Sequence, residues 1–195
     1  MHPREYFDRL ATRYSSVTSS GIGGVMKRRE RNSIIRLLSP KKGDSILDAG
    51  CGSGFYARLI SDLGAEVSCI DIAPKMVEVI AGVGFRAHVC DVESLRLERK
   101  FDKILCAGVL EFCKQPLRAL MSLREHLRNG GHVVLTFPNV SILGLTYWLY
   151  HLTHGVTISL FTLSRVASLL ESAGLRIQVI ERPLPFLFVV KARPI

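Results

Sequence analysis

Short apolar runs alternate with segments of helical periodicity along most of the chain. The apolar runs predict strands over 45–49, 66–71, 85–90, 101–107 and 132–137. The segments of helical period predict helices over 54–63, 74–81 and 116–128. Helices that connect parallel strands satisfy the right-handed crossover rule. The alternation therefore predicts an α/β chain with a doubly wound, mostly parallel sheet.

Both ends of the chain depart from this alternation. Residues 3–13 and 25–38 have helical periodicity, and we expect the Ser/Gly-rich stretch 15–24 between them to act as a hinge. After a predicted helix at 164–173, apolar runs at 175–180 and 186–191 flank a turn, which indicates an antiparallel hairpin. A length of 195 residues fits one domain with a full core, so we expect a single domain over 1–195.

Residues 46–54, Ile-Leu-Asp-Ala-Gly-Cys-Gly-Ser-Gly, join the first predicted strand to the first helix of the alternating region. Strand, glycine turn, helix, strand and acid is the order in which an α/β sheet builds a nucleoside-binding crevice. The acid is Asp71, which can accept hydrogen bonds from ribose hydroxyls or can cap the following helix. The three alternating glycines cost conformational entropy, which close contact between ligand and backbone would offset.

The residues on either side of the glycines disfavour a dinucleotide. Phe55 stands where the dinucleotide pattern needs a small residue for close helix–strand packing. Asp48, two residues before Gly50, would repel a pyrophosphate but suits a ligand with a cationic end. Its structural alternative is a cap for the glycine turn. A NAD-dependent reductase is therefore the weaker interpretation.

This segment resembles motif I (D/E-x-G-x-G-x-G) of class I S-adenosylmethionine-dependent methyltransferases, and the resemblance covers about residues 40–195. It implies S-adenosyl-L-methionine as cofactor and a Rossmann-like methyltransferase fold, with a seven-stranded, mostly parallel sheet and an antiparallel C-terminal hairpin. Asp48 would face the methionine amino group, Asp71 the ribose and Asp91 the adenine amino group. The cofactor-binding residues implied are Tyr14, Asp48, Ala49, Gly50, Cys51, Gly52, Gly54, Asp71, Ile72, Met76, Asp91, Val92, Ala107 and Gly108.

The resemblance also implies how the substrate side is built. Residues 1–39 would form a helical lid, with Tyr6 and Tyr14 closing over the cofactor. The segment 138–163 would be an insertion that covers the substrate, and it lies in an interval, 129–164, without Asp, Glu, Lys or Arg. An apolar cover favours a small lipophilic or aromatic acceptor, methylated at O, N or C, or a contact with lipid. The alternative is a helix packed on the core.

The sequence assigns no catalytic residue. Glu111, His151 and His154 are candidates for a general base, although an exposed loop acid and ordinary core or surface histidines describe them more simply. Phe112 stands where many quinone-type O-methyltransferases carry a histidine. The two histidines lack a nearby acid or cysteine, so we expect no metal site.

Charge and composition leave the partner open. The net charge is +9, and much of the excess positive charge lies between Lys27 and Lys42. This indicates either a solvated helix face or contact with an anionic partner, which would be a membrane surface, an acidic substrate or RNA. The fourth strand ends in Cys-Ala-Gly-Val at 106–109 instead of the (N/D)-P-P-(Y/F) of adenine-N6 methyltransferases, so we do not expect a nucleic-acid partner. An RNA or tRNA methyltransferase and a non-catalytic, cofactor-binding partner subunit stay as alternatives.

Cysteine usage bears on the compartment. The five cysteines form no Cys-x-x-Cys pair, and their odd number, without a signal-peptide pattern, favours a reduced cytoplasmic setting. A peripheral membrane contact is compatible with that setting. The oligomeric state is left open.

Overall fold

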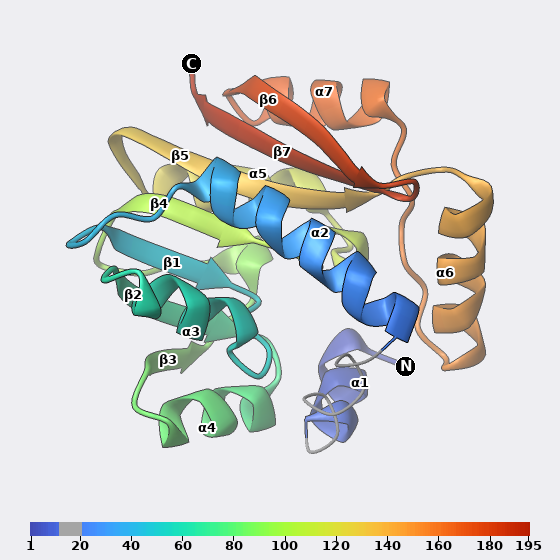
Figure 1. The fold of residues 1–195 in the computed structure, drawn as a ribbon, viewed down its shortest axis with the longest axis horizontal. Helices are drawn as coiled ribbons and strands as arrows, with labels where there is room; N and C mark the ends of the chain where they lie inside the picture. Colours follow the sequence, from blue (N-terminus) through green and yellow to red (C-terminus); the bar gives the residue numbers. More distant parts are fainter. Residues whose placement is uncertain (12–20) are drawn as a thin grey trace.

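A twisted mixed sheet runs through the computed structural model, which describes residues 1–11 and 21–195 (Figure 1). The strands are β1 (Ser45–Ala49), β2 (Glu66–Asp71), β3 (Arg86–Val89), β4 (Phe101–Cys106), β5 (Leu127–Pro138), β6 (Leu175–Leu184) and β7 (Leu187–Pro194). In this part of the chain they form one seven-stranded sheet in the order β3-β2-β1-β4-β5-β7-β6. Strands β1 to β5 pair in parallel, and β7 lies antiparallel to both β5 and β6.

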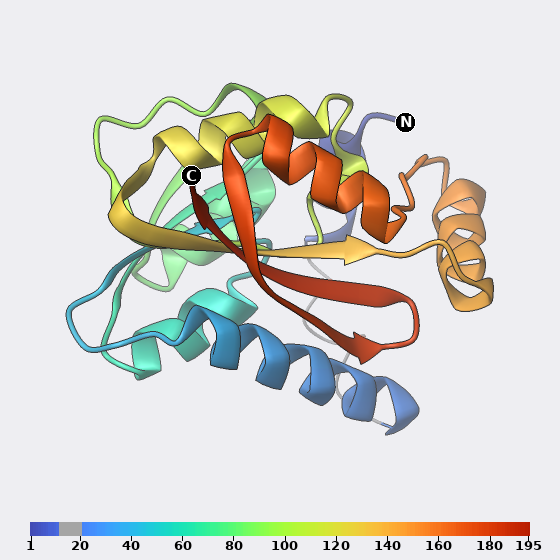
Figure 2. The same cartoon turned by 90° about the horizontal axis from the view of Figure 1, so that it is seen from above.

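Helices cover both faces of the sheet (Figure 2). They are α1 (Pro3–Leu10), α2 (Gly21–Leu38), α3 (Phe55–Asp62), α4 (Pro74–Gly82), α5 (Pro116–Glu125), α6 (Ile142–Thr153) and α7 (Leu163–Ser172), with short 3-10 helices η1 (Val92–Ser94) and η2 (Leu110–Phe112). Helices α2 and α3 pack on one face, where Ile34 and Tyr56 join a cluster with Ile46 of β1. Helices α5 and α7 pack on the other face, where Leu123 and Val166 belong to the largest cluster.

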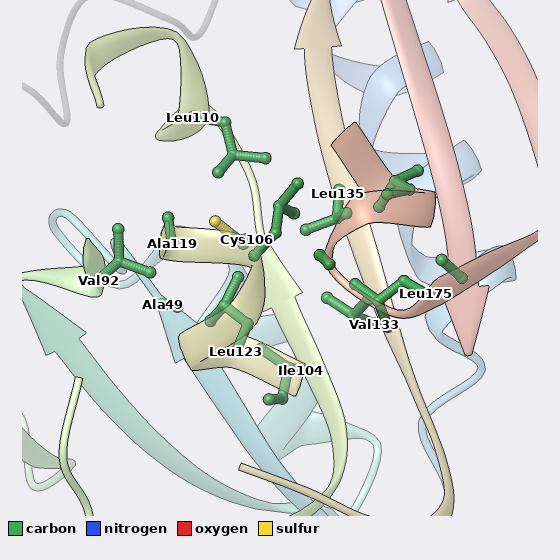
Figure 3. Close-up of a cluster of buried hydrophobic side chains, with 14 of the residues drawn as sticks. Ala49, Val92, Ile104, Cys106, Leu110, Ala119, Leu123, Val133, Leu135 and Leu175 are labelled. Carbon is green, nitrogen blue, oxygen red and sulfur yellow. The ribbon is translucent and has the colours of Figure 1, made fainter. Parts of the chain in front are cut away.

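Side chains of the central strands alternate between these two layers. In β4, Ile104 and Cys106 point into the α5 layer, whereas Leu105 belongs to the α2–α3 layer. Figure 3 shows Ile104 and Cys106 beside Leu123 and Ala119 of α5. Strands covered on both faces read as continuous apolar runs, which is why the sequence predicts them well.

The predicted fold class is confirmed, with differences at four places. The helix expected at 116–128 ends at Glu125, and β5 begins at Leu127 instead of residue 132. Near its start β5 passes through a register shift opposite β4, with Gly130 at φ 78°. The C-terminal strands are longer than predicted, because β6 is an edge strand and tolerates Pro183 at an irregularity in its pairing. Residues 21–24 of the expected hinge belong to α2, and residues 15–20 lie outside the described residues. The helix expected at 3–13 is α1, Pro3–Leu10, which ends before Ala11, and residues 12 and 13 lie outside the described residues.

The C-terminal half of α2 is fixed to the sheet by polar contacts. The Arg36 guanidinium pairs with Glu181 of β6 at 2.5 Å. His132 of β5 donates through Nε2 to the Leu38 carbonyl oxygen at 3.1 Å. Among the described side chains of α2, residues 24–32 are all exposed or half-buried, so the N-terminal half is held less tightly.

Candidate functional site

A cavity of about 510 Å³ opens at the carboxyl ends of the parallel strands. Its floor is built by the loops after β1, β2, β3 and β4, which carry residues 50–53, 71–72, 90–93 and 107–109. Helices α1 and α6 and the N-terminal half of α2 complete its walls. The crevice predicted from the strand–glycine–helix–strand pattern therefore exists, and it lies where an open parallel sheet binds ligands.

Most of the predicted site residues line this cavity. They are Gly50, Cys51, Gly52, Asp71, Ile72, Met76, Asp91, Val92, Ala107, Gly108, Glu111 and His151. Among the residues that the structure describes, Asp48, Ala49, Gly54 and His154 are not part of the lining. Tyr14 lies outside the described residues, so its predicted contact with the cofactor stays a prediction.

Packing accounts for two of the three glycines. Gly50 has φ 80°, and a Cβ atom there would lie 2.1 Å from Cγ2 of Val109. Gly54 has φ 82° and precedes α3, and its Cβ would lie 1.8 Å from Cδ1 of Ile80 in α4. A side chain at either position would therefore collide with the protein itself, in a backbone conformation that glycine adopts without cost. Contact with a ligand is not needed to explain them.

Asp71 organises the floor of the cavity through both carboxylate oxygens. Oδ2 accepts a hydrogen bond from the Gly52 amide and Oδ1 from the Ala73 amide, each at 2.9 Å. Burial raises the pKa of Asp71, while these backbone bonds oppose the rise. The residue at the N-cap of α4 is Ala73, so Asp71 is not the cap that the sequence offered as its alternative. Each oxygen keeps a second lone pair that a ribose hydroxyl can use.

Asp48 lies beneath the glycine loop and is only 2% exposed. Its Oδ2 atom has no hydrogen-bond partner among the described residues. Burial and, after it, the nearby Asp71 raise the pKa of Asp48 to about 7, and the Ala57 amide in the first turn of α3 opposes this rise. Ala57 belongs to α3 and not to the glycine turn, so this contact is not the cap of the glycine turn offered as the alternative, and the contact of Asp48 with a methionine amino group stays a prediction.

Asp91 and Glu93 follow β3 and extend the acidic lining. Asp91 precedes η1 and accepts from the Glu93 amide at 2.9 Å through Oδ1. Glu93 in turn accepts from the Gln115 amide at 2.8 Å, which ties this loop to the start of α5. With Asp71, these side chains place three carboxylates along one part of the cavity.

Glu111 corrects one expectation from the sequence. It is not an exposed loop acid but a side chain 3% exposed that lines the cavity. Burial raises the pKa of Glu111 to about 7. Its Oε1 accepts from the Tyr147 hydroxyl at 3.5 Å, and Oε2 has no hydrogen-bond partner within the described part of the chain.

His151 lies within α6 and His154 is its C-cap residue, and the two side chains differ in exposure. His151 is 6% exposed, lines the cavity and donates through Nδ1 to the Tyr147 carbonyl oxygen at 3.0 Å. With that proton on Nδ1, a neutral ring leaves Nε2 as an acceptor. Burial lowers the pKa of His151, which favours the neutral ring. His154 is exposed, and its Nδ1 bonds to the Tyr150 carbonyl oxygen at 2.7 Å.

Aromatic rings from distant segments meet around Glu111 and His151. The Phe7 and Phe112 ring centroids are 5.0 Å apart, and Phe112 lies 5.4 Å from the His151 ring. Tyr6 lies 6.0 Å from His151. Helix α1 thus contacts both η2 and α6 beside the cavity, and the lid expected at 1–39 stays a prediction.

The sequence predicted α2 only as part of the lid over 1–39 and named none of its residues as part of the site. Lys27 and Glu30 line it, and Glu30 accepts from the Tyr56 hydroxyl at 3.1 Å. Lys27 lies 3.5 Å from Glu30 and 5.3 Å from the centre of the Phe55 ring. The available signal was Glu30 itself, the one acid within the basic run 27–31.

The lining fits S-adenosylmethionine better than a phosphate-bearing cofactor. Carboxylates at Asp71, Asp91 and Glu93 can accept from hydroxyl and amino groups and tolerate positive charge, but they would repel phosphates. The cavity volume is in the range of small-molecule sites. In the described residues, no group of three or more His, Cys, Asp or Glu side chains is arranged to hold a metal ion.

Comparison with known proteins agrees with this chemistry. Residues 25–179 match the family model described as a methyltransferase domain. A ubiquinone biosynthesis O-methyltransferase of Xanthomonas euvesicatoria is 33% identical over 105 residues, which cover 50% of this chain and 44% of that protein. A tRNA U34 carboxymethyltransferase of Shewanella loihica is 35% identical over 107 residues, covering 50% and 32%. This chain therefore spans less than half the length of these curated relatives.

Solved structures share the fold at low identity. The magnesium protoporphyrin IX methyltransferase of Synechocystis, with bound S-adenosylhomocysteine, has a TM-score of 0.77 at 17% identity and covers 98% of both chains. An S-adenosylmethionine-dependent methyltransferase of Mesorhizobium loti has a TM-score of 0.71 at 22% identity, with 85% of this chain and 97% of that chain covered. The chain therefore belongs to the methyltransferase-domain family, and its recognition as a class I S-adenosylmethionine-dependent methyltransferase is confirmed.

Proposed function

We propose that this methyltransferase methylates a hydroxyl oxygen of a small lipophilic or aromatic acceptor. The observation that carries the proposal is Glu111, a buried carboxyl group with a free oxygen in the described structure and a pKa of about 7, on the wall of the cavity whose floor carries Asp71 and Asp91. A general base is most effective when its pKa lies near the working pH.

The floor of the cavity would hold the cofactor. Asp71 would accept from the ribose hydroxyls through the lone pairs that Gly52 and Ala73 leave free, and Asp91 from the adenine amino group. S-adenosylmethionine, when bound, supplies a methyl group activated by a sulfonium. The fixed positions of these carboxylates support catalysis by orientation, which is worth roughly 7–11 kcal/mol in favourable cases.

The opposite wall would hold the acceptor. Oε2 of Glu111 would take the proton of the acceptor hydroxyl, and the Tyr147 hydroxyl at Oε1 would stabilise the carboxylate form. Nε2 of His151 would accept from the same or a second hydroxyl of the acceptor. The surrounding aromatic rings would exclude water and contact an apolar acceptor.

The relatives support an aromatic acceptor without deciding it. The Xanthomonas protein is named for ubiquinone biosynthesis and for O-methylation, and the aromatic wall found here agrees with that substrate class. The Shewanella protein is named for tRNA, and the basic α2 helix agrees with an RNA partner. The buried position of Glu111 favours a small molecule. A polynucleotide is too bulky to pass between the aromatic rings that surround this side chain.

The test is Glu111→Gln, assayed with labelled S-adenosylmethionine against catechols and alkyl-substituted phenols. We expect kcat to fall by about 10²–10⁴-fold, because the amide cannot take the proton. Wild-type kcat should rise with pH through about 7, the pKa of Glu111, and level off above it, whereas the variant should lose this rise. Binding of S-adenosylhomocysteine should be unchanged by calorimetry.

Two controls separate this role from general damage. Glu98→Gln, at an exposed acid, should have wild-type activity. His151→Asn should lower activity, whereas His154→Asn should not, because only His151 lines the cavity. A Glu111→Gln enzyme with unchanged kcat and pH profile would contradict the base, and labelling of tRNA but of no small acceptor would overturn the substrate class.

A further inference from the structure

Helix α6 turns its aliphatic side chains away from the protein. The spacing of 3, 4 and 3 residues puts them in one stripe along the helix. The stripe consists of Ile142, Leu145, Leu149 and Leu152. Their exposed fractions are 83%, 54%, 53% and 42% in that order. The inward face carries the buried Gly144 and His151 instead, which reverses the usual pattern of a helix packed on its own core.

Basic residues lie at the same end of the molecule. The N-terminal half of α2 carries Lys27, Arg28, Arg29 and Arg31 against a single acid, Glu30. The N-terminal end of α2 lies on the same side of the molecule as α6 (Figures 1 and 2). Both helices border the cavity, α2 through Lys27 and α6 through Tyr150. Arg28 and Arg29 are exposed. An uncharged aliphatic stripe therefore lies near a cluster of positive charge.

We propose that α6 seats this protein on an anionic lipid surface. The stripe would enter the boundary between headgroups and acyl chains, while Arg28 and Arg29 contact the headgroups. Twelve residues of α6 span about 18 Å, which is shorter than the hydrocarbon core of a bilayer. Among the described helices, none is long and apolar enough to cross a membrane. The helix would therefore lie in the plane of the surface.

Charge favours lipid over a second copy of the chain. Two copies joined through α6 would bring two basic α2 helices toward each other, whereas anionic headgroups would neutralise them. The side chains beside the stripe agree with a lipid interface. Trp148 is half-buried and Tyr150 is 53% exposed on α6, and such amphipathic rings are enriched where membrane meets water.

The seating would place the mouth of the cavity at the lipid surface. Tyr147 and Tyr150 belong both to α6 and to the cavity lining. An acceptor dissolved in the lipid would then reach Glu111 without crossing water. This consequence rests on the proposed function, whereas lipid binding itself does not.

The test uses Trp148, the single tryptophan of the chain, which lies half-buried on α6. With vesicles of phosphatidylcholine and phosphatidylglycerol, we expect its emission to shift to shorter wavelength and to be quenched by brominated acyl chains. The affinity should be lower with phosphatidylcholine alone and should fall as salt is raised.

Matched variants locate the contact. Leu145→Ser/Leu149→Ser should lower the partition coefficient at least ~10-fold, because two exposed leucines no longer enter the lipid. Leu63 and Val83, at the C-caps of α3 and α4, are 49% and 52% exposed. The control variant Leu63→Ser/Val83→Ser should leave vesicle binding unchanged. Arg28→Glu/Arg29→Glu should weaken binding to anionic vesicles and not to neutral ones. Thermal unfolding and S-adenosylhomocysteine binding establish that each variant is folded.

Several outcomes would overturn the proposal. These are no binding to anionic vesicles, equal loss in both serine pairs, or vesicle binding without any change at Trp148. A concentration-dependent dimer in sedimentation velocity that only Leu145→Ser/Leu149→Ser abolishes, with vesicle binding unaffected, would assign the stripe to a second copy. Methyl transfer to a water-soluble catechol without vesicles tests the proposed function separately.

Discussion

Asp48 is a buried acid whose charge opposes folding. Its pKa is 3.8 in an exposed chain and about 7 in the folded protein, because burial penalises the carboxylate. The folded state therefore holds a proton that the unfolded state releases between these values. The stability that this proton contributes is complete below about pH 4 and is lost as the pH rises through about 7.

The first prediction concerns Asp48→Asn. The amide does not ionise. The free energy of unfolding should therefore fall less between about pH 4 and pH 7 in the variant than in wild type, by up to roughly 4 kcal/mol. Urea unfolding of the ligand-free protein at a series of pH values measures this. Asp62→Asn, at an exposed position, is the control. Parallel pH profiles for Asp48→Asn and wild type would contradict the assignment of this charge.

At the residue scale, the sequence located the acids but not their surroundings. Asp71 and Asp91 were predictable because Asp71 is the last residue of β2 and Asp91 comes two residues after β3 in the alternating pattern. The burial of Glu111 was not, because it depends on Tyr147, which is 36 residues away, and on Ser159, whose amide donates to the Glu111 carbonyl oxygen at 2.8 Å. Local sequence carries no signal for such contacts.

At the element scale, α1 is a cover that reaches both halves of the cavity. Phe7 packs with Ala11, Ala73 and Met76 near the end of β2 and against Phe112 of η2. Asp8 accepts from the Lys75 amide at 3.0 Å through Oδ1, which ties α1 to the start of α4. On these contacts we propose that α1 is part of the lid predicted over residues 1–39.

We therefore expect Phe7→Ala to weaken cofactor binding. Loss of this apolar contact should raise the Kd of S-adenosylhomocysteine about tenfold, the equivalent of ~1.4 kcal/mol. Isothermal titration calorimetry measures the change, with Leu163→Ala as a control at a partly exposed leucine of α7. Unchanged affinity in Phe7→Ala would count against a lid formed by α1.

The elements differ in how well the sequence predicted them. Strands β1 and β2 have the predicted bounds, because covered strands give uninterrupted apolar runs between turn residues. Helix α6 was not predictable in orientation, because an aliphatic stripe ordinarily marks the face that packs on the core. In this chain the stripe faces outward, and only the structure shows it.

At the scale of the whole molecule, the five cysteines are unpaired within a largely closed interior. Cys51, Cys69 and Cys106 are buried, and Cys90 and Cys113 are half-buried. Burial raises the pKa of the Cys90, Cys106 and Cys113 thiols, so they are poorly ionised at neutral pH. The predicted reduced setting stays a prediction, and the low reactivity follows from the fold.

Thiol titration tests this closure. In native protein, Ellman's reagent should react slowly and with Cys90 and Cys113 before the others, and all five should react after unfolding in guanidinium. S-adenosylhomocysteine should slow the native reaction further, because Cys90 and Cys113 line the cavity. Fast native reaction of all five thiols, or no effect of the ligand, would contradict the described packing.

The two halves of α2 are anchored unequally, and only the less anchored half borders the cavity. The ion pair of Arg36 with Glu181 and the bond from His132 to the Leu38 carbonyl oxygen tie the C-terminal half of the helix to the sheet. We expect the C-terminal half, in which Ile34 and Leu38 are fully buried, to open only at a high free energy, and the half that carries Lys27 and Glu30 to open locally at a lower one. The cavity would then admit and release its ligands while the sheet and its core stay folded.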